Sequence, residues 1–398
     1  MRSPSLHENK PLRYVVFFYL YVMQGIPAGF ALTAVTNYLT AEGLRPYEVG
    51  RFVALVGLPW ALQFIWGPII DRFQGSVMGR RKPWVILAQL MSFVASLGVL
   101  MIVDPVAQVF NLSLAFFIHS VFASVQDASV DAMAISTIPV TERGRVNAFM
   151  RGGLLFGIGL GAAVLSYLLR NWGFFYAALT QSLLLFGMMV ITFFIKEKSE
   201  DALFPWASRD SIRRTTIFHN KMSLRFIFAE LYQGVFAPKN LLLFGAIVLV
   251  YVCSSIFIRA LSIHLIQQLH WQDTALSVLT GTYGMIVAML SVLVAGVLSD
   301  KIGTRRLLMV VMVMIGGYLI SFNLLSSFWS NPAFAKGGLV VWYTFDPMYS
   351  VAAMPVLMSL CRQGVEDLNS PPTWRWLICP TLWVRTLPVT RSRGSRLL

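Results

Sequence analysis

The sequence predicts an all-α protein that crosses a membrane many times. Of its 398 residues, 57% are hydrophobic and only 13% are charged, whereas a soluble globular domain is nearer half apolar and a quarter charged. The apolar residues form long runs of helix length, unlike the alternating strands of about ten residues in a membrane barrel. The composition and the run lengths together set the fold class.

Ten apolar runs are expected to span the membrane. They cover residues 14–39, 47–70, 83–103, 108–136, 146–169, 174–195, 241–266, 276–298, 307–328 and 337–361. No small-residue cleavage site follows the first run, so it is expected to be a retained span rather than a signal peptide. The polar segment 196–240 then separates a six-span half, residues 1–195, from a second half of four spans, residues 241–362.

The placement of the basic residues predicts the orientation of the chain. Most Lys and Arg residues lie in the N-terminal segment, in alternate connections and in 196–240, whereas the opposite connections hold Arg45, Arg51, Arg170 and Lys336. Because basic loops stay in the cytoplasm, the N-terminus and the linker are expected there. The net charge of +14 therefore reflects topology, since a nucleic-acid surface would not alternate loop by loop.

A loop motif occurs twice, once after the second span and once after the eighth. Its residues are Gly67, Asp71, Arg72, Gly79, Arg80 and Arg81 in the first copy, and Gly296, Asp300, Lys301, Gly303, Arg305 and Arg306 in the second. The first glycine of each copy is expected to allow close helix approach. The acid is expected to cap or pair with a neighbouring helix, and the arginines to anchor at anionic headgroups. Alternatively, these charges only set topology.

This doubled motif, G-x-x-x-D-[RK] followed by an arginine pair, resembles the signature loop of the major facilitator superfamily. The resemblance implies two six-helix halves around a central cavity that opens alternately to each side by rocking. It also makes the second half incomplete, with about ten of the expected spans encoded.

A narrower resemblance covers residues 20–195. The stretches GIPAGF, LTAEGL, FVALVGLPWALQFIWGPIIDRF, MGRRKPWVILAQ and SVQDASVDAMA resemble the AmpG-like muropeptide permeases of the peptide/acetyl-CoA transporter branch. That resemblance implies proton-coupled import of anhydromuropeptides, which are cell-wall fragments recycled through the bacterial inner membrane. Relatives in the branch carry siderophores or acetyl-CoA, so an anion of that kind is the alternative ligand.

Two carboxylates stand in the apolar fourth run. Asp127 and Asp131 are four residues apart, so on a helix they share one face. Three interpretations compete. One acid could be a protonatable coupling site, since like charges this close disfavour joint ionisation. Alternatively, the acids form a structural ion pair, for which Arg151 is the candidate partner, or Asp131 lies at the membrane surface. The resemblance maps both acids and Gln126 onto the family's Gln-Asp pair and second acid.

Other polar residues in apolar runs are further candidates. Arg259 is a candidate for binding an anionic substrate group, or alternatively for extending to the outer surface. His119 and His264 are candidate proton relays, although a single buried histidine is more often simply hydrogen-bonded. Asp346 precedes Pro347, and the step is expected to loosen the helix beside a cavity.

The fifth span carries a repeated glycine pattern. Gly153 and Gly157 form G-x-x-x-G, which Gly161 extends, and this pattern predicts tight helix packing. The superfamily resemblance places that span at the interface between the halves. No catalytic cluster, metal spacing or paired cysteine spacing is present, so no enzyme, cofactor, metal or disulfide is expected. The expected partners are a small-molecule substrate, protons and the lipid bilayer, with a monomeric chain.

The tail 363–398 is expected to be out of frame. It holds no long apolar run and is rich in arginine and proline, so no membrane helix fits it. Synonymous codons chosen for residues 367–381, with one base restored before them, read GSQFTTYMALVNLSD, a helix-compatible continuation. A one-base deletion or a sequencing error near Glu366–Asp367 is therefore the hypothesis, with a divergent genuine tail as the alternative. A truncated product that does not transport is the rival function.

Overall fold

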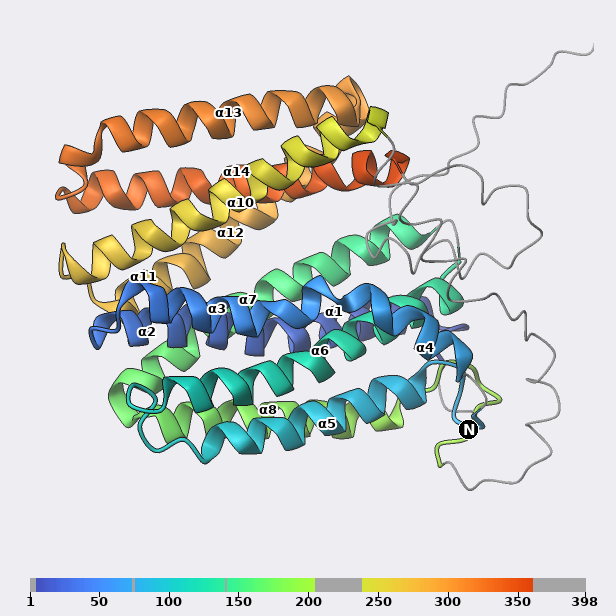
Figure 1. The fold of residues 1–398 in the computed structure, drawn as a ribbon. Helices are drawn as coiled ribbons and strands as arrows, with labels where there is room; N and C mark the ends of the chain where they lie inside the picture. Colours follow the sequence, from blue (N-terminus) through green and yellow to red (C-terminus); the bar gives the residue numbers. More distant parts are fainter. Residues whose placement is uncertain (1–4, 74–75, 140–141, 205–237, 361–398) are drawn as a thin grey trace, which may run out of the picture.

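The computed structural model describes residues 5–73, 76–139, 142–204 and 238–360. In these ranges the chain forms helices that run side by side as one long bundle (Figure 1). The predicted all-α class is confirmed. The out-of-frame tail 363–398, most of the linker and two cysteines, Cys361 and Cys379, lie outside the described residues.

Six helical segments make up the first half. They are α1–η1–α2 (Lys10–Gly29, Phe30–Val35, Thr36–Ala41), α3–η2–α4 (Pro46–Ala61, Gln63–Ile65, Trp66–Arg72), α5 (Lys82–Leu100), α6 (Val109–Thr137), α7 (Arg143–Trp172) and α8 (Phe174–Phe194). The segment η1 is π-helical, with wider turns than an α-helix.

The second half follows the linker and contains four helical segments among the described residues. They are α10 (Pro238–Gln267), α11–η5–α12 (Asp273–Val278, Leu279–Gly284, Met285–Ile302), α13 (Thr304–Leu324) and α14 (Pro332–Leu360), with a short 3₁₀ turn η6 (Ser326–Phe328). In Figure 1 they form the upper layer of the bundle.

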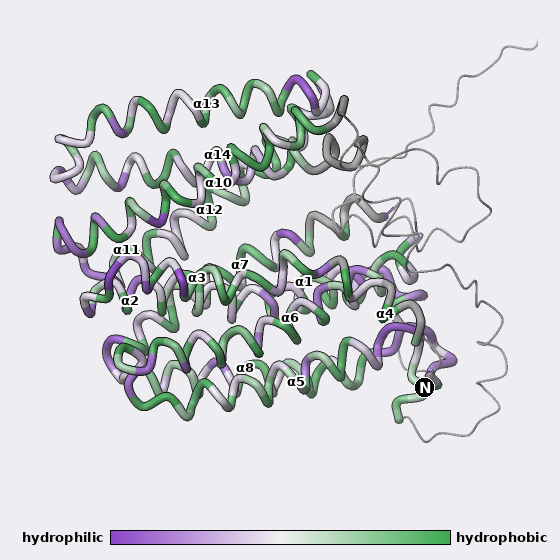
Figure 2. The backbone as a smooth tube through the Cα atoms, in the orientation of Figure 1, coloured by the Kyte–Doolittle hydropathy of each residue, from purple (hydrophilic) through white to green (hydrophobic). Residues whose placement is uncertain are grey.

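All ten predicted spans are helical, and eight helices are long and apolar enough to cross a membrane. The other two differ from that pattern. The second segment breaks after Leu62, where a 3₁₀ turn interrupts it, and α14 carries Lys336 and Asp346. Figure 2 shows hydrophobic residues along most of the helix lengths and hydrophilic residues gathered at the two ends of the bundle.

The two ends of the bundle carry different polar groups and are named here by one residue each. The Arg170 end, at the left of Figure 1, holds α2, α11 and the start of α8. The Glu197 end, at the right, holds α4, the starts of α1 and α5, and the segment after α8. Both copies of the loop motif lie at the Glu197 end, because each follows a helix that runs toward it.

The closest helix pair is α1 with α7. Gly157 of α7 lies so close to α1 that a side chain could not fit between them: a Cβ atom at this position would lie within 3.0 Å of Val22 O, Gly25 Cα and Val22 Cα. Gly153 and Gly161 also lie against the backbone of α1. On its other side α7 meets the second half, since Gly159 faces the backbone of Gly281 in η5. Helix α7 therefore packs against its own half and the other half at once.

The start of the chain pairs with the end of the first half. Ser5 and Lys196 form an isolated parallel β-bridge, and Leu6 N–H and His7 N–H donate to the carbonyls of Lys196 and Glu197 at 3.0 Å each. Leu6 is fully buried there. The segment that follows α8 thus packs against the N-terminal segment of the first half.

Candidate functional site

Asp127 and Asp131 lie one turn apart on α6, and each accepts a hydrogen bond from a neutral side chain of another helix. Gln63 Nε2 donates to Asp127 Oδ2 at 2.7 Å, and the Tyr21 hydroxyl donates to Asp131 Oδ1. Tyr21 is only 6% exposed, and Asp127 and Asp131 are each half-buried. The break after Leu62 brings Gln63 to this position.

Arg151 does not form the ion pair that the sequence suggested. Its charge acts on both carboxylates, but among the described residues no Arg151 nitrogen comes within 4.0 Å of a carboxylate oxygen. A guanidinium at this longer range moderates the repulsion between the two acids without locking either of them. The hydrogen bonds to the two acids therefore come from neutral donors, Gln63 and Tyr21.

Sequence reasoning missed Tyr21 and Gln63 as partners of the acids. Both stand in apolar runs, YVMQGIPAGF and PWALQFIWG, and a polar side chain in such a run was the available signal. Gln24 is a third such residue, since it is 7% exposed and its side chain lies next to the Asp127 carboxylate.

Two further polar groups of α6 are buried without a hydrogen-bond partner among the described residues. They are Gln126 Nε2, in a residue 3% exposed, and His119 Nε2, in a residue 2% exposed. No chain of hydrogen bonds links His119 to the two carboxylates in this part of the structure. Gln126 adjoins Asp127 in sequence but the structure pairs Asp127 with Gln63 instead.

Arg259 reaches from the second half to the first. Its Nη1 donates to the Leu32 carbonyl at 2.6 Å, within the π-helical turn η1. Such turns often mark functional positions in membrane helices. The guanidinium points into the bundle, so the interpretation that it extends to the membrane surface is wrong. Among the described residues no carboxylate lies within 4.0 Å of it.

The remaining candidates of the second half are dispersed. Asp346 is exposed, and α14 continues as a helix through the Asp346–Pro347 step. His264 packs edge-on against Trp329 with ring centroids 5.4 Å apart, which favours packing over a proton relay.

The two halves are joined at the Arg170 end by an ion-pair triad. Arg170 of α7 donates from Nε and Nη2 to Asp273 Oδ1 at 3.1 and 3.0 Å, and from Nη1 to Glu42 Oε1 at 2.8 Å. Asp273 belongs to the second half and is only 3% exposed. A buried carboxylate left without its partner is costly, so this triad holds the Arg170 end together.

Uncharged contacts join the halves at the same end. Asn37 Nδ2 donates to Ser277 Oγ at 2.9 Å. Gln267 Nε2 donates to the carbonyls of Thr40 and Leu44 at 3.0 and 2.7 Å. Among the described residues, every hydrogen bond between the halves is at this end, except the one from Arg259 to Leu32.

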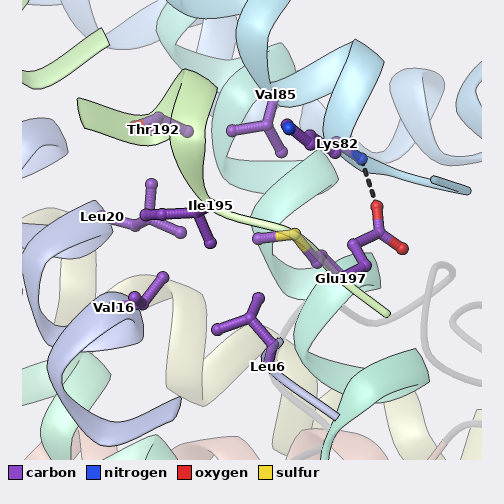
Figure 3. Close-up of a pocket in the computed structure, with 9 residues that line it drawn as sticks. Leu6, Val16, Leu20, Lys82, Val85, Thr192, Ile195 and Glu197 are labelled. Atoms are coloured by element: carbon purple, nitrogen blue, oxygen red, sulfur yellow. Dashed lines mark hydrogen bonds between the residues drawn. The ribbon is translucent and has the colours of Figure 1, made fainter. Parts of the chain in front are cut away.

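The first signature loop is buried at the Glu197 end. Glu197 accepts hydrogen bonds from the backbone N–H groups of Arg80 at 3.2 Å and Arg81 at 2.7 Å, which precede α5, and from that of Lys82. Figure 3 shows the bond from Lys82, the first residue of α5. Burial raises the pKa of the Glu197 carboxyl, and the N–H donors act in the opposite direction. Arg81 is 1% exposed, so the expectation that it anchors at lipid headgroups is wrong.

The N-terminal segment strengthens this loop region. Arg13, 4% exposed, donates to Glu142 Oε2 from Nη2 at 2.8 Å and to the His7 carbonyl from Nη1 at 2.8 Å. The cavity shown in Figure 3 between these elements has a volume of about 10 Å³ and is lined mainly by apolar side chains. It is too small for any solute larger than water.

The second signature loop has another environment. Lys301, Arg305 and Arg306 are exposed, as expected of charges that face headgroups or water. A Cβ added to Gly296 would meet nothing within 4 Å among the described residues, so its predicted role in close helix approach is wrong. Gly303, with φ +86°, ends α12 and begins α13. The side chains of Asp71, Arg72 and Asp300 lie outside the described set.

Comparison with known proteins identifies the family. A family model described as Major Facilitator Superfamily matches residues 17–366. The chain belongs to the Major Facilitator Superfamily. It is therefore a multi-pass membrane transporter, and both copies of its loop motif lie within the matched residues.

Two curated relatives are described as a permease and as a putative transporter. The chain is 21% identical to the Anhydromuropeptide permease of Escherichia coli strain K12 over 367 residues, covering 92% of this chain and 71% of the relative. It is 26% identical to the Putative transporter AmpG 3 of Rickettsia prowazekii strain Madrid E over 293 residues, covering 71% of this chain and 65% of the relative.

Solved transporters of the superfamily share its fold. The xylose transporter XylE from E. coli, in a structure described as a partially occluded inward open conformation, superposes with a TM-score of 0.59. The sequence identity is 13%, and the match covers 92% of this chain and 95% of that chain. An inward open structure of the same transporter gives a TM-score of 0.55, covering 93% and 94%.

Proposed function

We propose that this chain imports anhydromuropeptides or related cell-wall fragments across the bacterial inner membrane and couples the import to protons. The similarity to the E. coli permease over 92% of the chain supports the substrate class. The observation that carries the coupling is the Asp127–Asp131 pair, held by Gln63 and Tyr21 inside the bundle. A proton on one acid of such a pair relieves their mutual repulsion.

In this mechanism Asp127 takes up and releases the coupled proton. Its Oδ2 is bonded to an amide donor that cannot itself ionise, so a change of protonation alters the charge without removing a counter-ion. Asp131 and Tyr21 share the neighbouring hydrogen bond, and Gln126 has an amide available for a solute. Arg151 acts on the pair at longer range.

Arg259 supplies the positive charge of the second half. Its one hydrogen bond to a described residue goes to a backbone carbonyl, which a carboxylate of the solute can replace with a stronger, charge-assisted bond. Solute binding would then release the contact with Leu32 that crosses between the halves. The same chemistry suits other anions of this transporter branch, such as a siderophore or an acetyl-CoA-like molecule, and this is the second candidate function.

The structure fits a state closed at the Arg170 end. The triad and the amide contacts join the halves there. With the N-terminus in the cytoplasm, the Arg170 end faces outward, and the cavity would open inward as in the XylE structure described as inward open. The chain would work as a monomer, since each half supplies part of the site.

Uptake into proteoliposomes tests the proposal. Labelled anhydromuropeptide should accumulate when the outside is acidified, and collapse of the gradient by a protonophore should stop it. Arg259→Gln should raise KM for the anionic solute by about tenfold with a smaller change in kcat, and Arg259→Lys should restore part of the affinity. Uptake that ignores the pH gradient would overturn coupling; uptake of a siderophore or an acyl-CoA alone would assign the second candidate function.

A further inference from the structure

A cleft opens at the Arg170 end that the transport site does not use. Its volume is about 600 Å³, within the range of about 300–1,000 Å³ typical of ligand pockets. Its walls come from both halves, because Tyr167, Arg170 and Asn171 belong to α7 of the first half, whereas His270, Trp271 and Gln272 belong to the turn between α10 and α11. The cleft in this form exists only while the two halves meet at this end.

The turn on the second-half side brings His270, Trp271 and Gln272 to the cleft; His270 and Gln272 are exposed, and Trp271 is half-buried because it also packs against apolar residues of the second half. His270 has φ +53°, a left-handed conformation uncommon outside glycine, and the turn is fixed by the bond from Trp271 N–H to the Leu265 carbonyl at 3.0 Å. Among the described residues, no side-chain hydrogen bond is made by His270, Trp271 or Gln272. Strained backbone of this kind is common at ligand sites.

The α7 wall adds a second aromatic ring and a second amide. Tyr167 is 59% exposed. Asn171 Nδ2 donates to the Tyr167 carbonyl at 2.8 Å, so its Oδ1 is left as an acceptor. The cleft therefore offers two aromatic faces, Tyr167 and Trp271, and two carboxamides, Asn171 and Gln272.

The charges at the cleft disfavour an anion. Arg170 is already paired with two carboxylates, Glu42 and Asp273, so the triad carries one net negative charge. An incoming anion would meet that charge and would have no free guanidinium. A neutral solute with many hydroxyl groups meets no such repulsion, while its apolar ring face can cover an aromatic side chain and its hydroxyls can pair with amides.

We propose that this cleft is a binding site for a neutral saccharide, separate from the transport site. Because both halves form its walls, a bound saccharide stabilises the state in which the Arg170 end is closed. The assignment of this face to the outside rests on the proposed orientation, but binding itself does not. An extracellular saccharide would then slow transport by holding that end shut.

Calorimetric titration of the full chain in lipid nanodiscs tests the site. Cellobiose and N,N′-diacetylchitobiose, two neutral disaccharides, should bind at millimolar concentration or below. Trp271→Ala should weaken binding by about tenfold or more, and Tyr167→Ala, at an exposed position, gives the same test if the first variant folds poorly. Trp172→Ala is the matched control, because Trp172 is 63% exposed on the same turn of α7 but does not line the cleft.

Two further variants separate this site from the transport site. Arg170→Gln should weaken saccharide binding, since it removes the triad that keeps the walls together, whereas Asp127→Asn should leave it unchanged. The proposal is overturned if neither disaccharide binds, if Trp172→Ala weakens binding as much as Trp271→Ala, or if tetramethylammonium binds in place of the sugars. Loss of binding with Asp127→Asn would also overturn it, because the sugar would then occupy the transport site.

Discussion

The loop after α4 and the loop after α12 carry the same motif, yet the first is buried among partners and the second is exposed. Glu197 accepts three backbone N–H groups at the first loop, and Arg81 is 1% exposed. At the second loop Lys301 and Arg305 are exposed. The comparison teaches that the motif sets the local turn, through a glycine with positive φ in each copy, whereas partners distant in sequence decide what its charges do.

The same asymmetry extends to the polar groups inside the bundle. The first half holds two carboxylates with neutral donors, Gln63 and Tyr21. The second half offers one guanidinium, Arg259, bonded to a carbonyl of the first half. The first half therefore carries the proton chemistry in the proposed mechanism, and the second half carries the anion contact.

The largest expected effect comes from a glycine pair, one in each half. In Gly157→Leu the new side chain would overlap the backbone of Val22 and Gly25, and two helix backbones would have to separate. Overpacking of this kind costs roughly 3 kcal/mol or more, so we expect little folded protein by size-exclusion chromatography. Gly296→Leu, which faces open space, should fold normally. Equal yields of the two variants would contradict the close α1–α7 contact.

The next effect concerns the carboxylates. Asp127→Asn keeps an acceptor for Gln63 but cannot bind a coupled proton, so pH-driven uptake should fall to the level of empty proteoliposomes while expression stays normal. Asp346→Asn, which changes an exposed acid of the second half, should retain uptake. Unchanged pH dependence in Asp127→Asn would remove Asp127 from the mechanism, and equal losses in both variants would break the asymmetry between the halves.

A smaller effect compares the two signature loops directly. Glu197→Ala leaves three backbone N–H groups without their acceptor, which should cost about 3 kcal/mol and lower the thermal midpoint by roughly 4 °C. Lys301→Ala, at the exposed loop, should leave the midpoint nearly unchanged. The measurement is thermal unfolding in detergent, followed by tryptophan fluorescence. Similar shifts for both variants would show that the two loops contribute alike.

The smallest effect is a pH dependence of stability. Burial raises the pKa of the Glu197 carboxyl above its ordinary value of 4.5, so the folded state binds this proton more tightly than the unfolded state does. Stability from this group is complete below pH 4.5 and is lost as the pH rises through the raised pKa. Burial raises the pKa of the Asp201 carboxyl as well. In Glu197→Gln the thermal midpoint should fall less steeply with rising pH; an unchanged slope would exclude Glu197 as its source.

The fold was largely predictable from the sequence, and the pairing of its polar groups was not. Apolar run lengths located every helical span, because a membrane leaves few alternatives to a helix. The run pattern did not reveal the break after Leu62, which brings Gln63 to Asp127. Nor did it reveal that Arg170 pairs with Asp273 across the halves, since helix periodicity gives no information about which helices are neighbours.

Arg151 and Arg81 show why proximity in sequence is a poor guide to partners. Arg151 lies near the start of the next predicted span and was the candidate partner, yet the acids bond to Tyr21 and Gln63, which are far away in the chain. Arg81 was assigned to headgroups from its place in a loop. It is buried because the segment after α8 folds over that loop.

The bridge between Ser5 and Lys196 makes the first half a closed ring of chain. Ser5 and Lys196 are neighbours, so a short connector could join the chain there and new termini could be opened at another loop, as in a circular permutant. During synthesis this ring can close once Glu197 has been added, before the second half exists. The first half can therefore mature as an independent unit, on whose α7 face the later helices assemble.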